Sequence, residues 1–441
     1  MNKIKAALWF ISIFLIIAIG LWHGGTVGAE KPTHSPTEIN THIEWETNTQ
    51  VTFDAVEKEG PIMRVSPDSE TLLIAYNVIR DGSEDKFDVL YAESVDQGAT
   101  WITSTIQAET GITGTISSQV DLEYDASGTA HAVWVYGSAL AYGRYSEWDA
   151  DIPFKPYDPA FPNFVLYPNI IASGDETLDI VWSASSNIMH MRSTNGGDNW
   201  GLVENVSPLF AFKTSIDIAV QEDNLHVVWE DVNTTNLVSG TIVYSQGDAT
   251  VSPVVWSEPI TISKVISTGI HDAHETSITV NNNTLQVAYT HRQTKETQWV
   301  YITQCSLSLD CTQVDNWDFN DVPISGAELG VNAEAPWNVF TDLISYNGCV
   351  YAHFHGTTTD YDEDNELIWS TNSCSNWANN GNRQELTNPQ VQALFPSATV
   401  SGQRVYMAYG QNPTLGDPYH QIFFRRGAAT GRQVYLPVIL K

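Results

Sequence analysis

The segment HDAHE, residues His271–Glu275, brings imidazole and carboxylate groups together in a spacing that could bind a metal ion or transfer protons. His291 and His355 lie further along the chain and would have to converge on this segment for either chemistry. Two histidines three residues apart in a loop are a weak signal, and hydrogen-bonded loop histidines are the interpretation that we favour. We therefore predict no metal site and keep His271, His274 and His355 as candidate ligand contacts.

The acidic segment DYDEDNE, residues Asp360–Glu366, places side-chain oxygens at alternate positions, as calcium-binding loops do. It lacks the central glycine of known calcium loops, so a solvated acidic loop is the interpretation that we favour. No cofactor is required by the sequence, and structural calcium stays the alternative here.

A proline-rich link carries four aromatic residues, which is unusual for a loop: Trp148, Phe154, Tyr157 and Phe161. Exposed aromatic rings stack on sugar rings, so these residues are the preferred candidates for glycan contact. The alternative is that the rings fold down as a plug against the body of the protein. The sequence leaves both interpretations open.

The elements that would position these groups follow from an internal repeat. Short apolar runs recur at intervals of 47 to 65 residues, and each ends in an aromatic residue: Tyr76, Trp134, Trp182, Trp229, Tyr289, Phe354 and Tyr409. Most runs follow one extended segment and precede two more, the last of which begins at a tryptophan. Four antiparallel strands per repeat predict an all-β fold, a β-propeller of seven blades, with six blades as the alternative.

A propeller must also close its ring. The last repeat offers three strands, so the fourth comes either from EWETNTQVTF, residues 44–53, or from RQVYLPVILK near the C-terminus. We favour the N-terminal strand because it ties both ends of the chain into one sheet and leaves no open edge. Residues 432–441 are then an extra strand or an export-sorting tail.

The ends and the composition predict export. Residues 1–29 have two lysines, an apolar run and small residues placed for cleavage, as a signal peptide does, and an uncleaved membrane anchor is the alternative. Residues 30–41 are expected to be a linker and residues 42–431 the propeller. The net charge of -32 excludes nucleic acid and anionic lipid as partners, and the four cysteines fit an oxidising compartment. We expect a secreted or cell-surface monomer.

The segment SVDQGATW, residues Ser94–Trp101, recurs as STNGGDNW and, degraded, as STNSCSNW. Chemically it is typical of a turn, in which an oxygen accepts backbone N–H bonds, a glycine takes positive φ and a tryptophan packs between blades. The segments resemble the Asp box, or bacterial neuraminidase repeat, of sialidase-like propellers. The residues matched are Ser94, Asp96, Gly98, Trp101, Ser193, Asn195, Gly197, Trp200, Ser370, Asn372 and Trp377.

Cys374 stands at the position of a glycine in the degraded copy. Cys349 and Cys374 would lie at the same end of one hairpin, which supports a disulfide between them and leaves Cys305 and Cys311 to form the other.

The resemblance implies that function lies on the face opposite the Asp boxes. For a sialidase it further implies three arginines that hold the substrate carboxylate, a general acid, and a tyrosine nucleophile paired with a glutamate. The candidate arginines are Arg64, Arg80 and Arg292. Asp81 is the candidate acid, and Tyr409 with Glu230 is the candidate nucleophilic pair. The sequence departs from the family because Arg64 lies in MRVSP and not in an aromatic-Arg-Ile-Pro motif. The leading hypothesis is therefore a non-catalytic propeller that binds carbohydrate or another surface ligand. An exo-sialidase or related glycosidase is the second, and a structural cell-surface module is the third.

Overall fold

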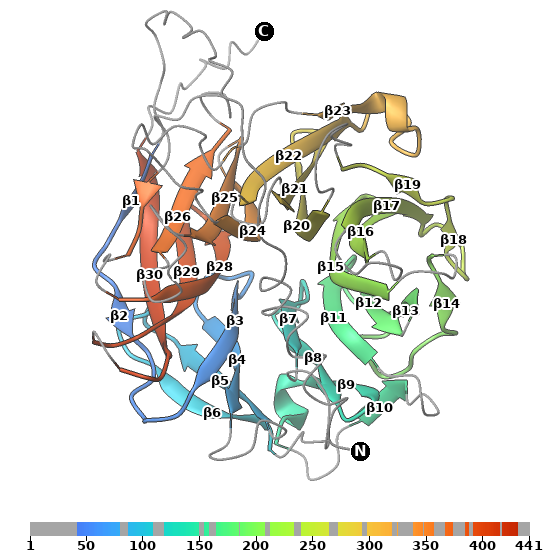
Figure 1. Cartoon of the computed structure of the whole chain (residues 1–441). Helices are drawn as coiled ribbons and strands as arrows, with labels where there is room; N and C mark the ends of the chain where they lie inside the picture. Colours follow the sequence, from blue (N-terminus) through green and yellow to red (C-terminus); the bar gives the residue numbers. More distant parts are fainter. Residues whose placement is uncertain are drawn as a thin grey trace, which may run out of the picture.

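The computed structural model describes residues 42–79, 87–108, 119–149, 154–157, 165–184, 186–207, 212–232, 240–263, 272–292, 298–319, 324, 338–346, 348–356, 367–373, 384–387, 391–414 and 417–430. These residues form seven antiparallel sheets of four or five strands around one axis, a seven-bladed β-propeller (Figure 1). The sequence prediction of an all-β, seven-bladed propeller is confirmed.

The first four blades follow one another along the chain. Blade 1 contains β3 (Lys58–Val65), β4 (Leu72–Ile79), β5 (Phe87–Ser94) and β6 (Ile102–Gln107). Blade 2 contains β7 (Val120–Tyr124), β8 (Ala130–Tyr136), β9 (Ala139–Arg144) and β10 (Phe154–Tyr157). Blade 3 contains β11 (Val165–Ala172), β12 (Leu178–Ala184), β13 (Asn187–Ser193) and β14 (Glu204–Asn205). Blade 4 contains β15 (Phe212–Gln221), β16 (Asn224–Val232), β17 (Gly240–Asp248), β18 (Val255–Trp256) and β19 (Ile260–Thr261).

The remaining blades complete the ring. Blade 5 contains β20 (Asp272–Asn281), β21 (Thr284–Arg292), β22 (Gln298–Ser306) and β23 (Trp317–Phe319). Blade 6 contains β24 (Asn338–Tyr346), β25 (Cys349–Gly356), β26 (Leu367–Asn372) and β27 (Gln384–Glu385). Blade 7 combines β28 (Ala393–Ser401), β29 (Arg404–Gln411) and β30 (Gln421–Thr430) with β1 (His42–Trp45) and β2 (Thr49–Gln50).

The N-terminal strand closes the ring, as expected. β1 pairs antiparallel with β30, with His42 opposite Thr430 and Trp45 opposite Gly427, and β2 pairs with the same strand. The two strands lie beside β30 in Figure 1. Residues 432–441 and residues 1–41 lie outside the described part of the chain.

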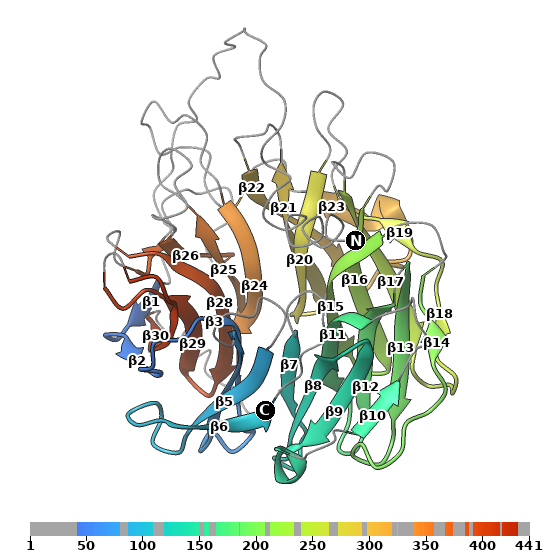
Figure 2. The same cartoon turned by 60° about the horizontal axis from the view of Figure 1, so that its bottom comes forward.

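The recurring apolar runs are the second strands of the blades. In β12, for example, all seven residues are buried, because neighbouring blades cover both faces of the strand. A strand covered on both faces needs apolar residues at consecutive positions, which explains runs such as LDIVW and LHVVW. The first strands, β3, β7, β11, β15, β20, β24 and β28, line the axis (Figure 2).

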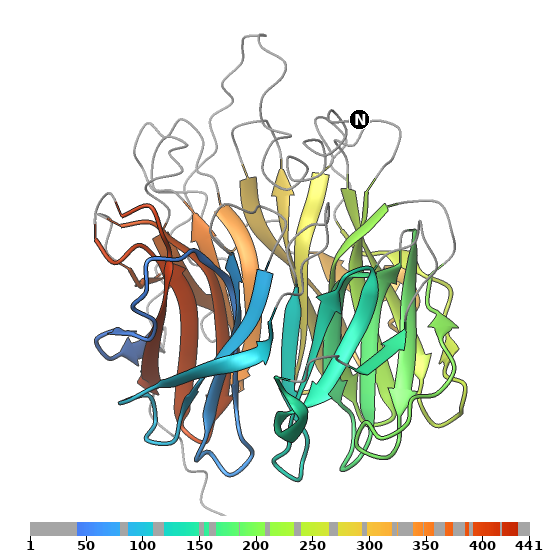
Figure 3. The same ribbon diagram turned by 90° about the horizontal axis from the view of Figure 1, so that it is seen from below.

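The two faces of the propeller differ in the connections that they carry. The turns from first to second strands and from third to fourth strands lie on one face, here called the Asp-box face. The opposite face, called the loop face, carries the connections from second to third strands and between blades. Figure 3 shows the strands upright, with the Asp-box face and its short turns at the lower edge.

The first Asp-box segment is a structural turn, as its chemistry indicated. The hydroxyl of Ser94 donates to Asp96 over 2.8 Å and accepts a bond from the backbone N–H of Gly98, also over 2.8 Å. Asp96 accepts from the N–H of Thr100, and the indole N–H of Trp101 donates to the carbonyl of Gly98. The polar groups of Ser94, Asp96 and Trp101 are therefore occupied by hydrogen bonds within the turn.

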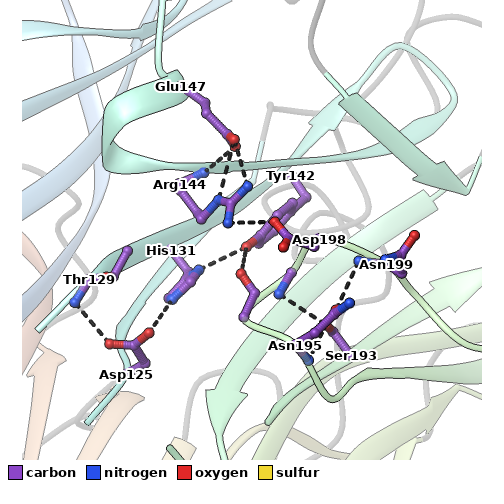
Figure 4. Close-up of polar contacts among 12 residues, drawn as sticks. Asp125, Thr129, His131, Tyr142, Arg144, Glu147, Ser193, Asn195, Asp198 and Asn199 are labelled. Carbon is purple, nitrogen blue, oxygen red and sulfur yellow. Dashed lines mark hydrogen bonds and ion pairs between the residues drawn. The ribbon is translucent and has the colours of Figure 1, made fainter. Parts of the chain in front are cut away.

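The second segment repeats this geometry (Figure 4). The N–H of Gly197 donates to the hydroxyl of Ser193 over 2.9 Å, and Asn195 accepts from the N–H of Asn199 over 2.9 Å. Trp200 takes the place of the first segment's tryptophan.

The third segment departs from the prediction. Ser94 and Ser193 end their strands, whereas Ser370 lies inside β26 opposite His353 and is followed by Asn372 in the same strand. The pairing of β25 with β26 fixes this register, so Ser370 does not occupy the strand-end position that Ser94 and Ser193 share. Trp377 lies outside the described residues.

Tryptophans join neighbouring blades at the Asp-box face. In each case the tryptophan contacts a ring on the third strand of the preceding blade, with ring centroids 4.9 to 5.2 Å apart. These pairs, here called latches, are Trp101 with Phe424, Trp148 with Tyr91, Trp200 with Tyr142, Trp256 with His190 and Trp317 with Tyr244. The latches explain why a tryptophan recurs before the fourth strands.

The disulfide predictions are tested in part. Cys305 and Cys311 form a disulfide that clips the turn of blade 5. Cys349 is also disulfide-bonded. Its expected partner, Cys374, lies outside the described residues.

Candidate functional site on the loop face

Strained residues form a ring where the first strands begin at the loop face. The pairing of first and second strands shifts by a bulge at this height in six blades. In five of these bulges one residue has positive φ, of 48° to 55°: Gly60, Tyr167, Ser215, Glu275 and Phe395. We call these five the strained ring. Four of them are not glycine, so the conformation costs about 1 to 3 kcal/mol each and needs support from the surrounding fold. Strained residues and bulges of this kind cluster at binding and active sites.

Phe395 presents an aromatic ring within this set. Its side chain is 42 % exposed, and the ring stands edge-on to His355 with centroids 5.4 Å apart. The N–H of Phe395 donates to His355 Nδ1 over 3.4 Å. Burial lowers the pKa of His355 to about 3, so this histidine is neutral and serves as an acceptor that supports Phe395.

A pair of glutamates lies beside the strained ring on blade 1. Glu57 accepts bonds from the backbone N–H of His420 over 2.9 Å and from its ring over 2.7 Å, and the same ring contacts Gln392 over 3.0 Å. Glu59 lies next to Gly60 in β3. Burial and the nearby charge of Glu57 raise the pKa of Glu59 to about 7, with His420 opposing the shift. Near neutral pH, Glu59 is therefore divided between its acid and carboxylate forms.

Glu230 and Asp231 end the second strand of blade 4 at the loop face. Glu230 is 9 % exposed and accepts a 2.6 Å bond from the hydroxyl of Thr214. Asp231 forms an ion pair with Lys213 and accepts from the indole of Trp229 over 3.1 Å. The predicted Glu230 thus lies at the expected face, held by a first-strand threonine.

Arg64 lies deeper along the axis than the strained ring. Its Nη2 atom is 3.3 Å from Asp121 Oδ1, and its Nε atom is 3.3 Å from Glu123 Oε2, both on β7 of the next blade. Burial disfavours the charged form of Arg64 and so lowers its pKa. The surrounding carboxylates, led by Asp121, outweigh burial, and the pKa of Arg64 is raised. The guanidinium is therefore engaged within the axial region, toward the Asp-box face.

A second set of polar residues, the axial ring, ties the first strands together. It consists of Asp121, Asn169, Asp217, Ser277, Asp342 and Ser397, which occupy one register level of six blades. Asp121 accepts from the N–H of Ile170 in the next blade over 2.9 Å, Asp217 from Ile278 over 2.9 Å, and Asp342 from Ala398. Burial raises the pKa of Asp217 to about 6 and that of Asp342 to about 7. These residues hold blades together below the candidate site.

Tyr409, predicted as the nucleophile, is fully buried between blades 6 and 7. Its hydroxyl accepts a bond from Asn48 over 3.1 Å, and burial raises its pKa to about 12. The backbones of His274 and Arg292 lie in β20 and β21 at the loop face. Arg80, Asp81, Phe161 and His271 lie outside the described residues, so the arginine clamp stays a prediction.

The structure describes three of the four aromatic residues of the proline-rich link, and they lie in different surroundings. Trp148 follows a single 3-10 turn, η1 (Tyr145–Glu147), at the Asp-box face, and it forms the latch of blade 2. Phe154 begins β10 with 53 % of its surface exposed, and Tyr157 packs on Trp182 with centroids 5.1 Å apart. Trp148 and Tyr157 therefore follow the alternative in which the rings pack on the blades.

Glu57, Glu59, His420 and Phe395 were not singled out from the sequence. The paired glutamates of VEKEG, residues 56–60, are the one signal that could have suggested them. Within the described residues, no group of three or more histidine, cysteine, aspartate or glutamate side chains is arranged to hold a metal ion. The same residues contain no helix long and apolar enough to cross a membrane.

Comparisons with known proteins give the fold only. No protein-family model matches the sequence, and no curated protein does. A protein of unknown function from Dyadobacter fermentans is similar in structure, with a TM-score of 0.51 and 12 % identity over 88 % of this chain and 99 % of that one. The sialidase of Trypanosoma rangeli has a TM-score of 0.46 and 11 % identity over 84 % of this chain and 54 % of its own. The GH93 α-L-arabinofuranosidase of Fusarium graminearum has a TM-score of 0.45 and 13 % identity over 87 % and 98 %.

Proposed function

We propose that the chain is an exported propeller that binds carbohydrate at the strained ring on the loop face. The observation that supports this most is Phe395, whose backbone has positive φ and whose phenyl group is exposed. It lies at the same height along the axis as Glu59 and Glu275. An exposed aromatic ring stacks on the apolar face of a sugar, and carboxylates accept bonds from its hydroxyls. The positive φ values of these residues are unfavourable, and a requirement to hold the side chains in place for a ligand would explain why the fold keeps them.

Replacing Phe395 with alanine should weaken glycan binding about fivefold, because a lost aromatic contact costs about 1 kcal/mol. A glycan array identifies the ligand, and calorimetry then compares the variants. The matched control is Val95→Ala, which removes an apolar side chain 72 % exposed in an Asp-box turn. Equal affinity for wild type and Phe395→Ala would place the binding site elsewhere.

Glycoside hydrolysis is the second candidate function, and the carboxyl group of Glu59 is the observation that favours it. A general acid must still hold its proton near neutral pH, and Glu59 is held near that point by burial and by Glu57. Glu57 and Glu230 are further carboxylates at this face, and glycosidases use pairs of carboxylates.

The test is turnover of a panel of fluorogenic glycosides, including a sialoside, by the mature chain. Glu59→Gln should lower kcat about 100-fold or more, and the wild-type rate should fall as the pH rises through about 7, where the acid form of Glu59 is lost. Glu222→Gln, an exposed turn residue at the Asp-box face, is the control. Turnover that Glu59→Gln leaves intact would contradict the role of Glu59, and absence of turnover would leave a binding protein.

A further inference from the structure

The turn that joins the third and fourth strands of blade 4 lacks the residues of an Asp box. Residues 249–256, here called the blade 4 turn, read ATVSPVVW. Counted back from the tryptophan, they carry Ala249, Val251 and Pro253 where the first Asp box has its serine, aspartate and glycine. The side chains of these three residues have no oxygen, so they cannot accept the backbone N–H bonds that hold an Asp box together.

Two charged side chains of blade 3 bind the blade 4 turn. Arg192 Nη1 donates to the backbone carbonyl of Ala249 over 2.9 Å. Glu204 accepts from the N–H of Val254 over 2.9 Å and from the indole N–H of Trp256 over 3.3 Å. Figures 1 and 2 show β14, which carries Glu204, beside β18 of blade 4. The attachment of the turn therefore depends on what holds Arg192 and Glu204 in place.

His190 lies between the two carboxylates of this network. Its ring is fully buried, with Nε2 2.7 Å from Asp179 Oδ1 and Nδ1 2.9 Å from Glu204 Oε2. Asp179 also accepts from Arg192 Nε over 2.8 Å and from Nη2 over 3.0 Å, as an ionised carboxylate does. An ionised carboxylate only accepts hydrogen bonds, so both ring nitrogens of His190 must donate. The ring is therefore doubly protonated.

The charges around this ring balance when it is protonated. The charged groups on the strands and turns packed around it are Asp179 on β12, Arg192 on β13, Glu204 on β14, and Asp223 and Asp248 in exposed turns of blade 4. In the buried network, His190 and Arg192 carry two positive charges against two carboxylates. Burial lowers the pKa of His190, but the hydrogen bonds to the two carboxylates outweigh burial and raise it.

We propose that doubly protonated His190 locks the blade 4 turn to blade 3, and that loss of one proton in mild base releases the turn. A neutral imidazole has a single N–H, so one ring nitrogen would direct a lone pair at a carboxylate oxygen. The buried network would also carry one uncompensated negative charge, which is costly. Glu204 is the carboxylate that can move into water, because 14 % of its side chain is exposed against none of Asp179. Its movement would free Val254 and Trp256.

The lock is closed in mild acid and opens as the pH rises. Because the pKa of His190 is raised in the folded state, the stabilisation is complete below about pH 6.5 and is lost as the pH rises through the raised pKa. The ratio of bound to released turn falls by up to about tenfold per pH unit in that range. Burial raises the pKa of Asp179 and of Glu204, but their bonds to His190 outweigh burial and lower it, so both stay ionised in mild acid.

Hydrogen exchange of the full chain at pH 6.0 and 8.5, corrected for intrinsic rates, tests this inference. The N–H of Val254 should lose up to about 100-fold in protection at pH 8.5. The N–H of Gly98, bound to the hydroxyl of Ser94 in the first Asp box, should keep its protection. His190→Gln, which cannot hold the second proton, should abolish the difference at Val254. His190→Tyr, which installs the latch ring of blades 2 and 4, is the second variant if glutamine impairs folding.

The matched control is His131→Gln, which removes another buried histidine, one that contacts a single carboxylate, Asp125, in blade 2. This variant should retain the response of Val254. Equal protection of Val254 at the two pH values in the wild type would overturn the inference. A full response to pH in both His190 variants would do so as well.

Discussion

Replacing Gly197 with alanine is expected to lower the free energy of unfolding by about 4 kcal/mol, whereas the same change at Gly196 should cost about 1.5 kcal/mol. Both glycines have positive φ, 63° at Gly196 and 89° at Gly197, so alanine is strained at either position. A Cβ atom on Gly196 meets nothing within 4 Å, but one on Gly197 would lie 1.8 Å from the Tyr142 hydroxyl oxygen. The extra cost is therefore the displacement of Tyr142 from its place between blades 2 and 3.

Urea unfolding of the three proteins measures the two costs. Tyr142→Ala is destabilising by itself, since it removes a latch ring and its bonds to His131 and Gly196. In that background, however, Gly197→Ala should cost no more than Gly196→Ala, because the overlapping ring is gone. Equal costs for the two glycine variants in the wild-type background would show that backbone strain alone sets the cost of alanine in this turn.

The fold could be predicted from the sequence because each blade places its second strand between two neighbours. That environment favours a predominantly apolar run that ends in an aromatic residue, and such a run is visible in the sequence of each repeat. The register of the third Asp-box segment could not be predicted. Its serines and asparagines offer several alignments to the box, and the pairing of β26 with β25 is what shows that Ser370 lies inside the strand.

The candidate site was less predictable, because its properties arise from the closed ring. In the sequence, Phe395 and Glu275 look like ordinary strand residues. In the structure, each lies in a bulge and has positive φ. The acidity of Glu59 depends on burial and on Glu57 and His420, and His420 is distant in sequence. The depth of Arg64 depends on how β3 lies against β7, so residue type suggested a ligand clamp where the structure shows an ion pair with Asp121.

Replacing Arg64 with methionine is expected to lower the free energy of unfolding by about 3 kcal/mol, because it leaves Asp121 and Glu123 without their cation in a buried setting. The guanidinium is 25 % exposed, which keeps the expected cost at the low end for a buried pair. Arg404→Met, which breaks a surface pair 3.6 Å from Glu46, should cost less than about 1 kcal/mol and is the control.

The same variant separates the structural role of Arg64 from the clamp implied by the sialidase resemblance. Burial already raises the pKa of Asp121 and Glu123, with Arg64 opposing the shift. Without Arg64 both groups should hold their protons to higher pH, so the deficit of Arg64→Met should shrink as the pH falls toward 4. Adding Glu123→Gln should recover part of the stability at pH 7 by removing an unpaired charge. A clamp residue would give the reverse pattern, in which Arg64→Met unfolds like the wild type but no longer binds an anionic sugar.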